Sequence, residues 1–330
     1  MNLLDVQNEL WVGDVQLGAP AQGPFSVVFD SGSSNLWLPN ELCLLAGCKN
    51  RDKYNPSKSS KYVANGESFF IPYGTGSVYG KLAADDLQVA GLTVTNTTFG
   101  MAEYMAEFFA QVPQIDGILG LAYENIAVDH VEPVLDTMAA RGVIPSASFS
   151  TYFSSDWNST DSKLFFGGAP QEYYEGTMTY AAVSLPSYYL VTMGKYGAGT
   201  FEHKCALGDC PAVIDTGTSA IVMSTKGLID QIPAVNTDCS NLSSLPTISF
   251  TFDGVDYPLE PEYYVLKVPS SSNADELECV LGIEYSVLSA PLNIIGDPFF
   301  RKYFTFFDKA NNRVGFAKSK KPSDVAKMQQ

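Results

Sequence analysis

Short runs of apolar residues, continuous or alternating with polar ones, recur along the whole chain. Residues 25–29 (Phe-Ser-Val-Val-Phe) and 68–73 (Ser-Phe-Phe-Ile-Pro-Tyr) both end where turn-forming residues begin, as is typical of β-strands. Further predicted strands cover residues 87–89, 93–99, 148–153, 163–166, 188–193, 248–252, 263–268 and 304–307. Helical patterns are limited to residues 132–141, 226–232 and 299–303. Many short strands and little helix predict a mostly β protein.

Two apolar segments carry almost the same sequence. Residues 28–39 read Val-Phe-Asp-Ser-Gly-Ser-Ser-Asn-Leu-Trp-Leu-Pro, and residues 213–224 read Val-Ile-Asp-Thr-Gly-Thr-Ser-Ala-Ile-Val-Met-Ser. A second pair of similar segments follows, Asp-Gly-Ile-Leu-Gly at 116–120 and Asn-Ile-Ile-Gly-Asp at 293–297. Two apolar residues followed by glycine are typical of a buried strand that passes close to another backbone. The repeat therefore indicates that the chain contains a duplicated lobe.

The duplication predicts two β lobes, residues 1–170 and 171–330. The boundary is placed in the Gly-Gly-Ala-Pro segment at 167–170, which follows a predicted strand and begins a turn-rich region. The lysine-rich residues 318–330 contain few apolar side chains, and we expect them to form a flexible basic end.

The repeated motif carries the most informative polar residues, Asp30 and Asp215. A single Asp-Ser-Gly or Asp-Thr-Gly is usually an ordinary turn, but two copies in matching apolar frames favour a shared function. A duplicated lobe can place two carboxylates face to face across its pseudo-twofold axis. Two carboxylates at short range cannot both ionise easily, so they share a proton and their pKa values split. Such a pair can activate water with one oxygen and protonate a substrate with the other.

With these motifs in this order, the sequence resembles a pepsin-type aspartic protease over residues 10–317. The matching segments are 29–37, 73–77, 116–123, 213–219, 294–297 and 307–317. The resemblance implies a mostly β, bilobal pepsin-like fold of two pseudo-twofold related lobes with a substrate cleft between them. It also implies an endopeptidase that works at acid pH without a cofactor or metal and prefers bulky apolar residues around the scissile bond.

The resemblance assigns the catalytic acids to Asp30 and Asp215, which hold the water and polarise the scissile carbonyl. Around them it assigns Gly32 and Gly217 as the glycines that let the loops approach. It assigns Ser33 and Thr218 as the hydroxyls that donate to the outer carboxylate oxygens, and Ser31 and Thr216 as the hydroxyls that tie the loops together. Ser31 departs from the threonine that is usual in the family, so we expect a slightly looser tie.

The resemblance also places a flap and apolar subsites. Tyr73, Gly74, Thr75 and Gly76 would form the mobile tip of a β-hairpin that closes over the substrate, and Trp37 would hold Tyr73 through its indole N–H. Substrate side chains next to the scissile bond would contact Val28, Phe109 and Ile118 on one side and Tyr188 on the other. A simple core position is the alternative interpretation for Trp37 and for each subsite residue.

The charge of the chain narrows the range of partners. Acidic residues outnumber basic ones by 36 to 20, which gives a net charge of −16. A broad nucleic-acid or anionic-membrane surface is therefore not expected, and no apolar run is long enough for a transmembrane helix. The acidic excess serves solubility or suits an acidic lumen, where the carboxylates would be neutral.

The six cysteines give information about the redox state of the compartment in which the protein resides. Cys43, Cys48, Cys205, Cys210, Cys239 and Cys279 fall in three pairs along the chain, although six cysteines permit fifteen connectivities. Metal binding is a weaker alternative, because no Cys-x-x-Cys occurs and the two histidines are isolated. Disulfides would indicate an oxidising compartment, and sequons at Asn96, Asn158 and Asn241 agree with it. The resemblance implies the pairs 43–48, 205–210 and 239–279.

These observations lead us to expect a secreted or acidic-lumen aspartic endopeptidase, monomeric, that binds extended protein or peptide substrates and statine-type inhibitors. The first five residues lack a signal-peptide pattern, so we expect a processed, mature form of a zymogen. One alternative is a catalytically silent binding glycoprotein on the same fold, which would usually lack an Asp, a motif glycine or the flap tyrosine. Another is an acid glycosidase with paired carboxylates.

Overall fold

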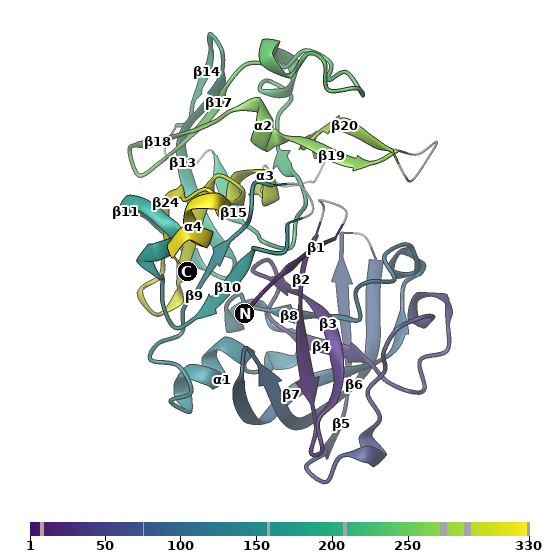
Figure 1. Ribbon diagram of the computed structural model, residues 1–330. Helices are drawn as coiled ribbons and strands as arrows, with labels where there is room; N and C mark the ends of the chain where they lie inside the picture. The colour runs from purple at the N-terminus through teal and green to yellow at the C-terminus, as the bar shows by residue number, and fades with distance from the viewer. Residues whose placement is uncertain are drawn as a thin grey trace. The chain divides into compact units, whose positions relative to one another are not determined.

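The computed structural model describes residues 1–6, 10–74, 76–156, 159–206, 210–270, 276–286 and 292–328. Strands predominate over helices (Figure 1), which confirms the predicted mostly β class. The chain divides into two compact units, of which the first comprises Met1 and Val12–Ala147 and the second comprises Asn2–Trp11 and Ser148–Gln330. Among the helices of the described residues, none combines the length and apolar character that crossing a membrane requires.

The first unit is built around one sheet that closes on itself. Its strands are β2 (Leu10–Leu17), β3 (Gln22–Asp30), β4 (Leu36–Pro39), β5 (Val63–Tyr73), β6 (Gly76–Val89), β7 (Leu92–Met105) and β8 (Gly117–Gly120). They pair in the order β2-β3-β8-β4-β7-β6-β5, and β2 also pairs with β6 from Val15↔Val89 to Leu17↔Leu87. Because β2 pairs with both β3 and β6, the strands from β2 to β6 form a closed ring, as in a barrel.

Short helices and a compact apolar cluster complete the first unit. The helices are η1 (Ala46–Cys48), η2 (Pro56–Lys58), η3 (Glu107–Gln111), η4 (Glu124–Ile126), η5 (Val128–His130) and α1 (Val134–Ala140). The cluster includes Trp37, Phe69, Leu82, Met105 and Phe109, all buried. Because β4, β5, β6, β7 and η3 all contribute to it, the cluster fixes the positions of these elements against one another.

The second unit contains two larger sheets and a separate hairpin. Its strands are β1 (Leu4–Val6), β9 (Phe149–Tyr152), β10 (Lys163–Phe166), β11 (Tyr174–Ala182), β12 (Leu185–Pro186), β13 (Tyr189–Ala198), β14 (Phe201–Lys204), β15 (Pro211–Ile214), β16 (Ile221–Met223), β17 (Ile248–Phe252), β18 (Val255–Leu259), β19 (Val265–Pro269), β20 (Leu277–Leu281), β21 (Ile283–Tyr285), β22 (Asn293–Ile295), β23 (Tyr303–Asp308) and β24 (Arg313–Ser319). One sheet has the order β10-β9-β23-β24-β11, and the other runs β18-β17-β13-β15-β22-β16-β21 with β12 and β14 also paired to β13. Strands β19 and β20 form the hairpin.

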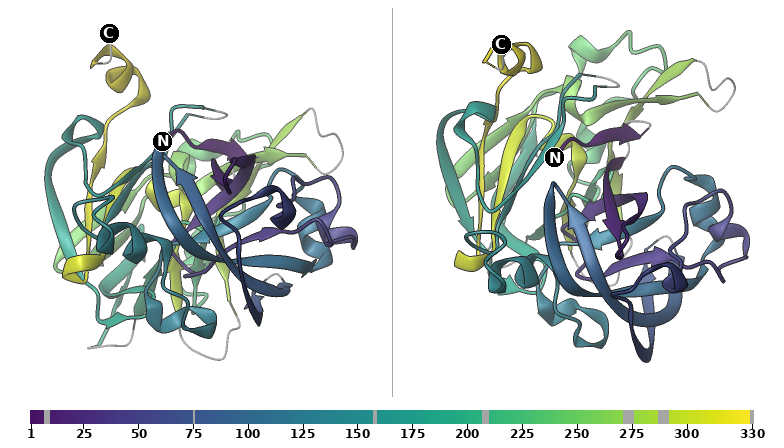
Figure 2. Two further views of the ribbon diagram at one scale, coloured as in Figure 1. Left: turned by 90° about the horizontal axis from the view of Figure 1, so that it is seen from below. Right: turned by 60° about the horizontal axis from the view of Figure 1, so that its bottom comes forward.

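The helices of the second unit are short. They are η6 (Gln171–Tyr173), η7 (Ile229–Gln231), η8 (Leu242–Ser244), α2 (Pro261–Tyr264), α3 (Asp297–Phe300), η9 (Lys309–Asn311) and α4 (Pro322–Met328). Helix α4, yellow and next to the C label in Figure 2, lies at the periphery of this unit. The sequence predicted a flexible end here, but Val325 is buried with Tyr152 and Phe304, so apolar contact holds this part of the tail.

The division between the units differs from the predicted boundary at residue 170. Strands β9 and β10 precede that boundary, yet β9 pairs with β23 and β10 pairs with β9. Their partners place residues 148–170 in the second unit. Residues Asn2–Trp11 also belong there: Asn2 bridges Lys163, and Trp11 stacks on Phe153 with ring centroids 4.6 Å apart.

A buried carboxylate supports the strand arrangement of the first unit. Asp116 lies directly before β8, and its carboxylate accepts hydrogen bonds from the backbone N–H of Ser26 on β3 at 2.9 Å and of Asp52 at 3.0 Å. Burial raises the pKa of Asp116 to about 6, although these two hydrogen bonds act in the opposite direction. The carboxyl group therefore keeps its proton in the folded state at a pH where the unfolded chain has released it.

We expect the free energy of unfolding to decrease as the pH rises from 3.8 to about 6, the unfolded and folded pKa values of Asp116. The protonated Asp116 contributes its full stabilisation below pH 3.8 and none above about pH 6, because the folded state favours the protonated carboxyl group more than the unfolded chain does. Asp116→Asn should be less stable at every pH but should lack this part of the pH dependence. Urea denaturation across this range measures both effects.

The charge of Asp52 also raises the pKa of Asp116, so Asp129→Asn, at an exposed acid of η5, serves as the control. This variant should keep the wild-type dependence on pH. An Asp116→Asn protein that follows the wild-type curve would show that another group causes the loss of stability.

Candidate active site

Asp30 is the last residue of β3 and begins the first copy of the repeated motif. Strand β3 pairs in parallel with β8, from Val27↔Gly117 to Asp30↔Gly120, and β4 then pairs antiparallel with the other side of β8. The motif turn thus connects β3 and β4, the two strands that pair with β8 on either side. A Cβ atom on Gly120 would lie 2.5 Å from the backbone nitrogen of Ser34, so only glycine permits this close approach.

Asp215 follows β15 in an equivalent arrangement within the second unit. Strand β15 pairs in parallel with β22, from Ala212↔Asn293 to Ile214↔Ile295, and β16 pairs antiparallel with the other side of β22. A Cβ atom on Gly296 would lie 2.2 Å from the carbonyl oxygen of Thr218. The sequence repeat therefore corresponds to a repeat of structure, including a glycine at the end of β8 and directly after β22.

The two carboxylates have the same hydrogen-bond donors. Asp30 accepts from the backbone N–H of Gly32 at 2.7 Å and from the Ser33 hydroxyl at 2.5 Å. Asp215 accepts in the same way from Gly217 and Thr218, at 2.9 Å and 2.6 Å. In both cases the backbone donor binds Oδ1 and the hydroxyl binds Oδ2. Two donors on each carboxylate stabilise its charged form and fix its orientation.

Both carboxylates are largely buried and yet reach solvent. Asp30 is 7% exposed and Asp215 is 9% exposed. Within each turn the residue after the aspartate, Ser31 or Thr216, is buried almost completely. The predicted tie between these two hydroxyls across the pseudo-twofold axis stays a prediction.

The hairpin of β5 and β6 carries Tyr73 at its tip. The strands pair up to Tyr73↔Gly76, and the indole N–H of Trp37 donates to the Tyr73 hydroxyl at 2.8 Å. Burial, and secondarily the charge of Asp30, raises the pKa of Tyr73. Its phenol therefore stays protonated and can act as a donor. Thr75, also predicted in the flap, lies outside the described residues.

The two flap glycines have different surroundings. A Cβ atom on Gly74 would meet nothing within 4 Å, whereas one on Gly76 would lie 2.6 Å from the Cβ of Ala106. Gly74 therefore has the free space that the predicted mobile tip requires. Gly76 is instead in close contact with the segment before η3.

The predicted subsite residues of the first unit lie close together. Phe109 contacts Trp37 edge-on, with ring centroids 5.5 Å apart, and Ile118 packs against the same cluster. Val28 is the register partner of Ile118 across β3 and β8. Tyr188 belongs to the second unit, directly before β13, and its side chain is 38% exposed. Trp37 and Phe109 are core residues beside Tyr73, and their predicted contact with substrate stays a prediction.

Sequence analysis missed Asp297 as a residue of this region. It follows Gly296, its backbone N–H donates to Thr218 O at 3.0 Å, and its side chain is almost fully buried. Burial raises the pKa of Asp297 well above the ordinary value, Arg301 opposes this, and the charges of Asp5 and Asp215 add to it. The available signal was an asymmetry of the repeat, because the first copy has Leu121 where the second has Asp297.

The six cysteines form the three disulfides that the resemblance implied, Cys43–Cys48, Cys205–Cys210 and Cys239–Cys279. Among the described residues, His203, Cys205 and Cys210 form a group of three possible metal ligands. Both sulfurs belong to one disulfide, so this group offers no thiolate to a metal.

The sequons differ in their surroundings. Asn96 is exposed, whereas the side-chain amide of Asn241 donates to Ala234 O at 2.8 Å and accepts from the Asn236 N–H at 2.9 Å. Asn158 lies outside the described residues. Asn96 is therefore the more accessible of the two described sequons.

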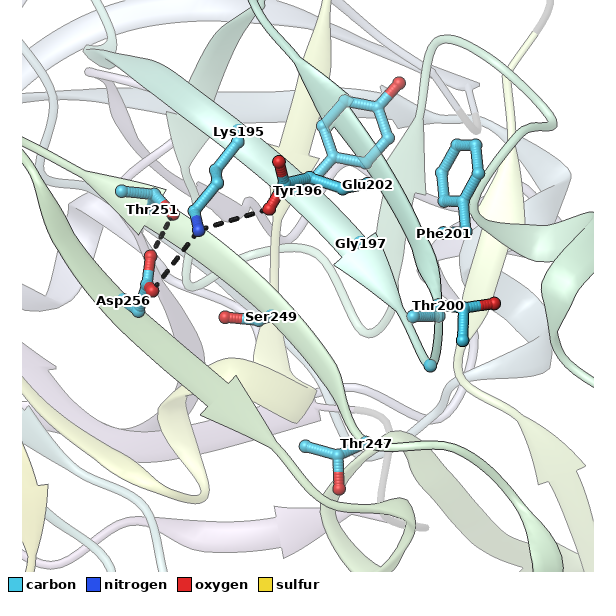
Figure 3. A pocket seen from close by; sticks show the side chains of 12 residues that line it. Lys195, Tyr196, Gly197, Thr200, Phe201, Glu202, Thr247, Ser249, Thr251 and Asp256 are labelled. Carbon is cyan, nitrogen blue, oxygen red and sulfur yellow. Dashed lines mark hydrogen bonds and ion pairs between the residues drawn. The ribbon is translucent and has the colours of Figure 1, made fainter.

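A cavity of about 250 Å³ lies on a polar surface of β13, β14 and β17 in the second unit (Figure 3). Lys195 forms ion pairs there with Glu202 at 3.3 Å and with Asp256 at 3.4 Å. None of the predicted site residues lines this cavity. Its charged side chains are exposed and partner one another, and such pairs contribute little to stability.

Comparison with known proteins identifies the family of the chain. The family model described as Eukaryotic aspartyl protease matches residues 10–319 of the chain. The chain belongs to this family. The aspartyl protease is therefore an aspartic endopeptidase with the pepsin-like fold, and its substrates are peptides.

Similar proteins span nearly the whole aspartyl protease chain. Cathepsin E of Aquarana catesbeiana is 38% identical over 328 residues, which cover 96% of this chain and 80% of the relative. Pepsin A of Bos taurus is 38% identical over 326 residues, covering 96% and 85%, respectively. Pepsin A of Sus scrofa is 37% identical over 329 residues, covering 96% and 82%.

The hydroxyl that binds Asp30 provides a test of the site. Ser33→Ala removes a hydrogen bond that stabilises the ionised carboxylate, and such bonds contribute about 1.5–3 kcal/mol. We therefore expect the acidic limb of the pH–rate profile for peptide cleavage to move up by about one to two pH units. Cleavage of a peptide at saturating and low concentrations across the acid range measures the shift.

Ser33→Thr is the matched control, because it keeps the hydroxyl and copies the residue at the equivalent position, Thr218. Its profile should coincide with that of the wild type. Superimposable profiles for Ser33→Ala and the wild type would mean that this hydrogen bond does not influence the active site.

Proposed function

We propose that the aspartyl protease hydrolyses peptide bonds at acid pH by direct attack of a water molecule activated between Asp30 and Asp215. The observation that carries this proposal is the equivalence of the two carboxylates. Each lies at or directly after the end of a strand, each accepts one backbone and one hydroxyl hydrogen bond, and each remains slightly exposed. Two carboxyl groups with the same kinds of hydrogen-bond donor and similar burial are suited to sharing one proton.

In this mechanism the ionised carboxylate takes a proton from water while the water oxygen bonds to the peptide carbonyl carbon. The protonated carboxyl group gives its proton to the carbonyl oxygen, so a neutral tetrahedral diol forms. In its collapse the ionised carboxylate takes a proton from one diol hydroxyl as the C=O bond forms and the C–N bond breaks, and the protonated carboxyl group gives its proton to the leaving nitrogen. No covalent bond to the protein forms. Activity decreases once both aspartates ionise, because no proton is then available for the carbonyl oxygen.

The flap residue Tyr73 would cover the bound peptide, with Gly74 providing freedom at the tip and Trp37 restraining the phenol through the 2.8 Å hydrogen bond. Val28, Phe109 and Ile118 would contact the apolar side chain on one side of the scissile bond and Tyr188 that on the other. The clustering of Phe109 and Ile118 with Trp37 and Tyr73 supports the first assignment. An extended substrate would share backbone hydrogen bonds with the flap.

We further propose that the protein acts as a monomer, is inhibited by statine-type compounds and works outside the cytosol, in a secreted form or in an acidic lumen. The three disulfides support an oxidising compartment. The net charge of −16 disfavours nucleic-acid and anionic-membrane partners. Asn96 is the described sequon best placed to carry a glycan, because it is exposed. Synthesis as a zymogen is part of the same proposal.

The decisive variants are Asp30→Asn and Asp215→Asn. Each should lower kcat by at least about 10²–10⁴-fold, the contribution of general acid–base catalysis, while circular dichroism and thermal stability stay close to the wild type. Cleavage of an unfolded protein across acid to mildly alkaline pH, with and without a statine-type inhibitor, measures the effect. Asp230→Asn, at an exposed acid of η7, is the control and should keep full activity. Near-wild-type turnover by either site variant would disprove the mechanism.

A further inference from the structure

A buried arginine connects the disulfide loop of the first unit to the helix that carries Phe109. Arg51 is 9% exposed and follows the loop closed by Cys43 and Cys48. Its Nε donates to Gly47 O at 2.7 Å, and its Nη2 donates to Phe109 O and, at 3.2 Å, to Val112 O. One planar guanidinium thus binds a carbonyl of the loop and two carbonyls at the end of η3.

The environment of Arg51 is suited to a fixed charge. Burial lowers the pKa of Arg51 and the nearby Asp116 raises it, and an arginine remains protonated in either case. Hydrogen bonds from a charged donor to backbone carbonyls are stronger than neutral ones. Phe109 O also accepts from the Val112 N–H, and Val112 O from the Ile115 N–H, both at 3.2 Å, so Arg51 uses the second lone pair of each carbonyl.

Close backbone contacts hold the same segment on two further sides. A Cβ atom on Gly47 would lie 2.4 Å from Met105 O and 2.5 Å from Ala106 O, so the disulfide loop lies directly against the segment before η3. The backbone N–H of Ala106 donates to Ser77 O of the flap hairpin at 2.9 Å. The disulfide loop and the flap hairpin therefore restrain the start of η3, and Arg51 restrains its end.

The orientation of η3 determines where the Phe109 ring lies. The ring meets Trp37 edge-on, and Trp37 in turn donates its hydrogen bond to Tyr73. A change in the last turn of η3 would move the Phe109 ring away from Trp37 without altering the motif turn of Asp30. This separation distinguishes an effect on the subsite from an effect on the catalytic carboxylates.

We propose that Arg51 is a positioning residue that sets the preference of the Phe109 subsite for bulky apolar side chains. By holding the carbonyls of Phe109 and Val112, it fixes the ring of Phe109 as a wall of the subsite. This inference rests on the proposed contact between Phe109 and the substrate. Loss of the guanidinium would leave the wall less defined, so a large side chain would lose complementary contacts while a small one would lose little.

The test uses two peptides that differ only in the residue on the amino-terminal side of the scissile bond, phenylalanine or alanine. Arg51→Met keeps the apolar stem but removes every donor. We expect it to lower the ratio of kcat/KM for the phenylalanine peptide over the alanine peptide about tenfold, in the range of a lost contact in an apolar pocket, mainly through a higher KM. The kcat for the alanine peptide and the pH profile should stay as in the wild type.

Three further variants complete the design. Phe109→Ala tests the subsite itself and should lower the ratio at least as much, and adding Arg51→Met to it should lower the ratio no further. Arg51→Lys keeps the charge without the planar fork and should give an intermediate ratio. Arg141→Met is the matched control, because Arg141 also donates to a backbone carbonyl, Asn96 O at 3.3 Å, but from an exposed position; it should keep the wild-type ratio.

The outcomes separate the two proposals. If Phe109→Ala lowers the ratio and both Arg51 variants keep it, the positioning role is wrong and the subsite assignment stands. If Phe109→Ala also keeps the ratio, the assignment of Phe109 to the subsite is wrong and the inference fails with it. Should Arg51→Met fail to fold, Arg51→Lys decides, together with faster amide hydrogen exchange in residues 105–112.

Discussion

The absence of side chains at Gly120 and Gly296 is the constraint on which the active-site geometry depends. Gly120 ends β8 and Gly296 directly follows β22, the strands that lie between the two arms of each motif turn, and a Cβ atom on either glycine would come within 2.5 Å of the turn backbone. The turn can therefore stay close enough for its own N–H and hydroxyl groups to bind the aspartate. Larger residues would push the turn outward and remove the donors that orient the carboxylate.

The same scaffold carries different electrostatics in its two copies. Behind Asp215 lies the buried Asp297, whose pKa is raised by burial, with Arg301 as an opposing charge. The equivalent position after Gly120 is the apolar Leu121. The first unit instead has Asp116, a carboxyl group whose pKa is raised by burial, directly before β8. Two copies of one motif thus reside in surroundings that respond differently to pH.

The sequence revealed those features that depend on local pattern. The β class, the repeated motifs and their following strands were all visible, and the resemblance supplied the disulfide pairing. The boundary could not be found in this way, because β9 belongs to the second unit through its distant partner β23. The roles of Arg51 and Asp297 were also hidden, since burial of a charged side chain results from tertiary contacts that adjacent residues do not encode. Likewise, only the packing of Val325 shows that helix α4 of the tail is held by apolar contact.

The placement of Asn2–Trp11 in the second unit has a consequence for biosynthesis. Asp5 pairs with Arg301 at 3.9 Å, and the Arg301 guanidinium lies over Trp11, so this segment needs partners that are synthesised only after the whole of Val12–Ala147. Residues Val12–Ala147 hold their own sheet and core and can fold while translation continues. Asp5 and Trp11 can reach their partner only after Arg301 has been synthesised. Vectorial synthesis thus completes one unit early, whereas the other is completed only by joining two segments that lie far apart in the sequence.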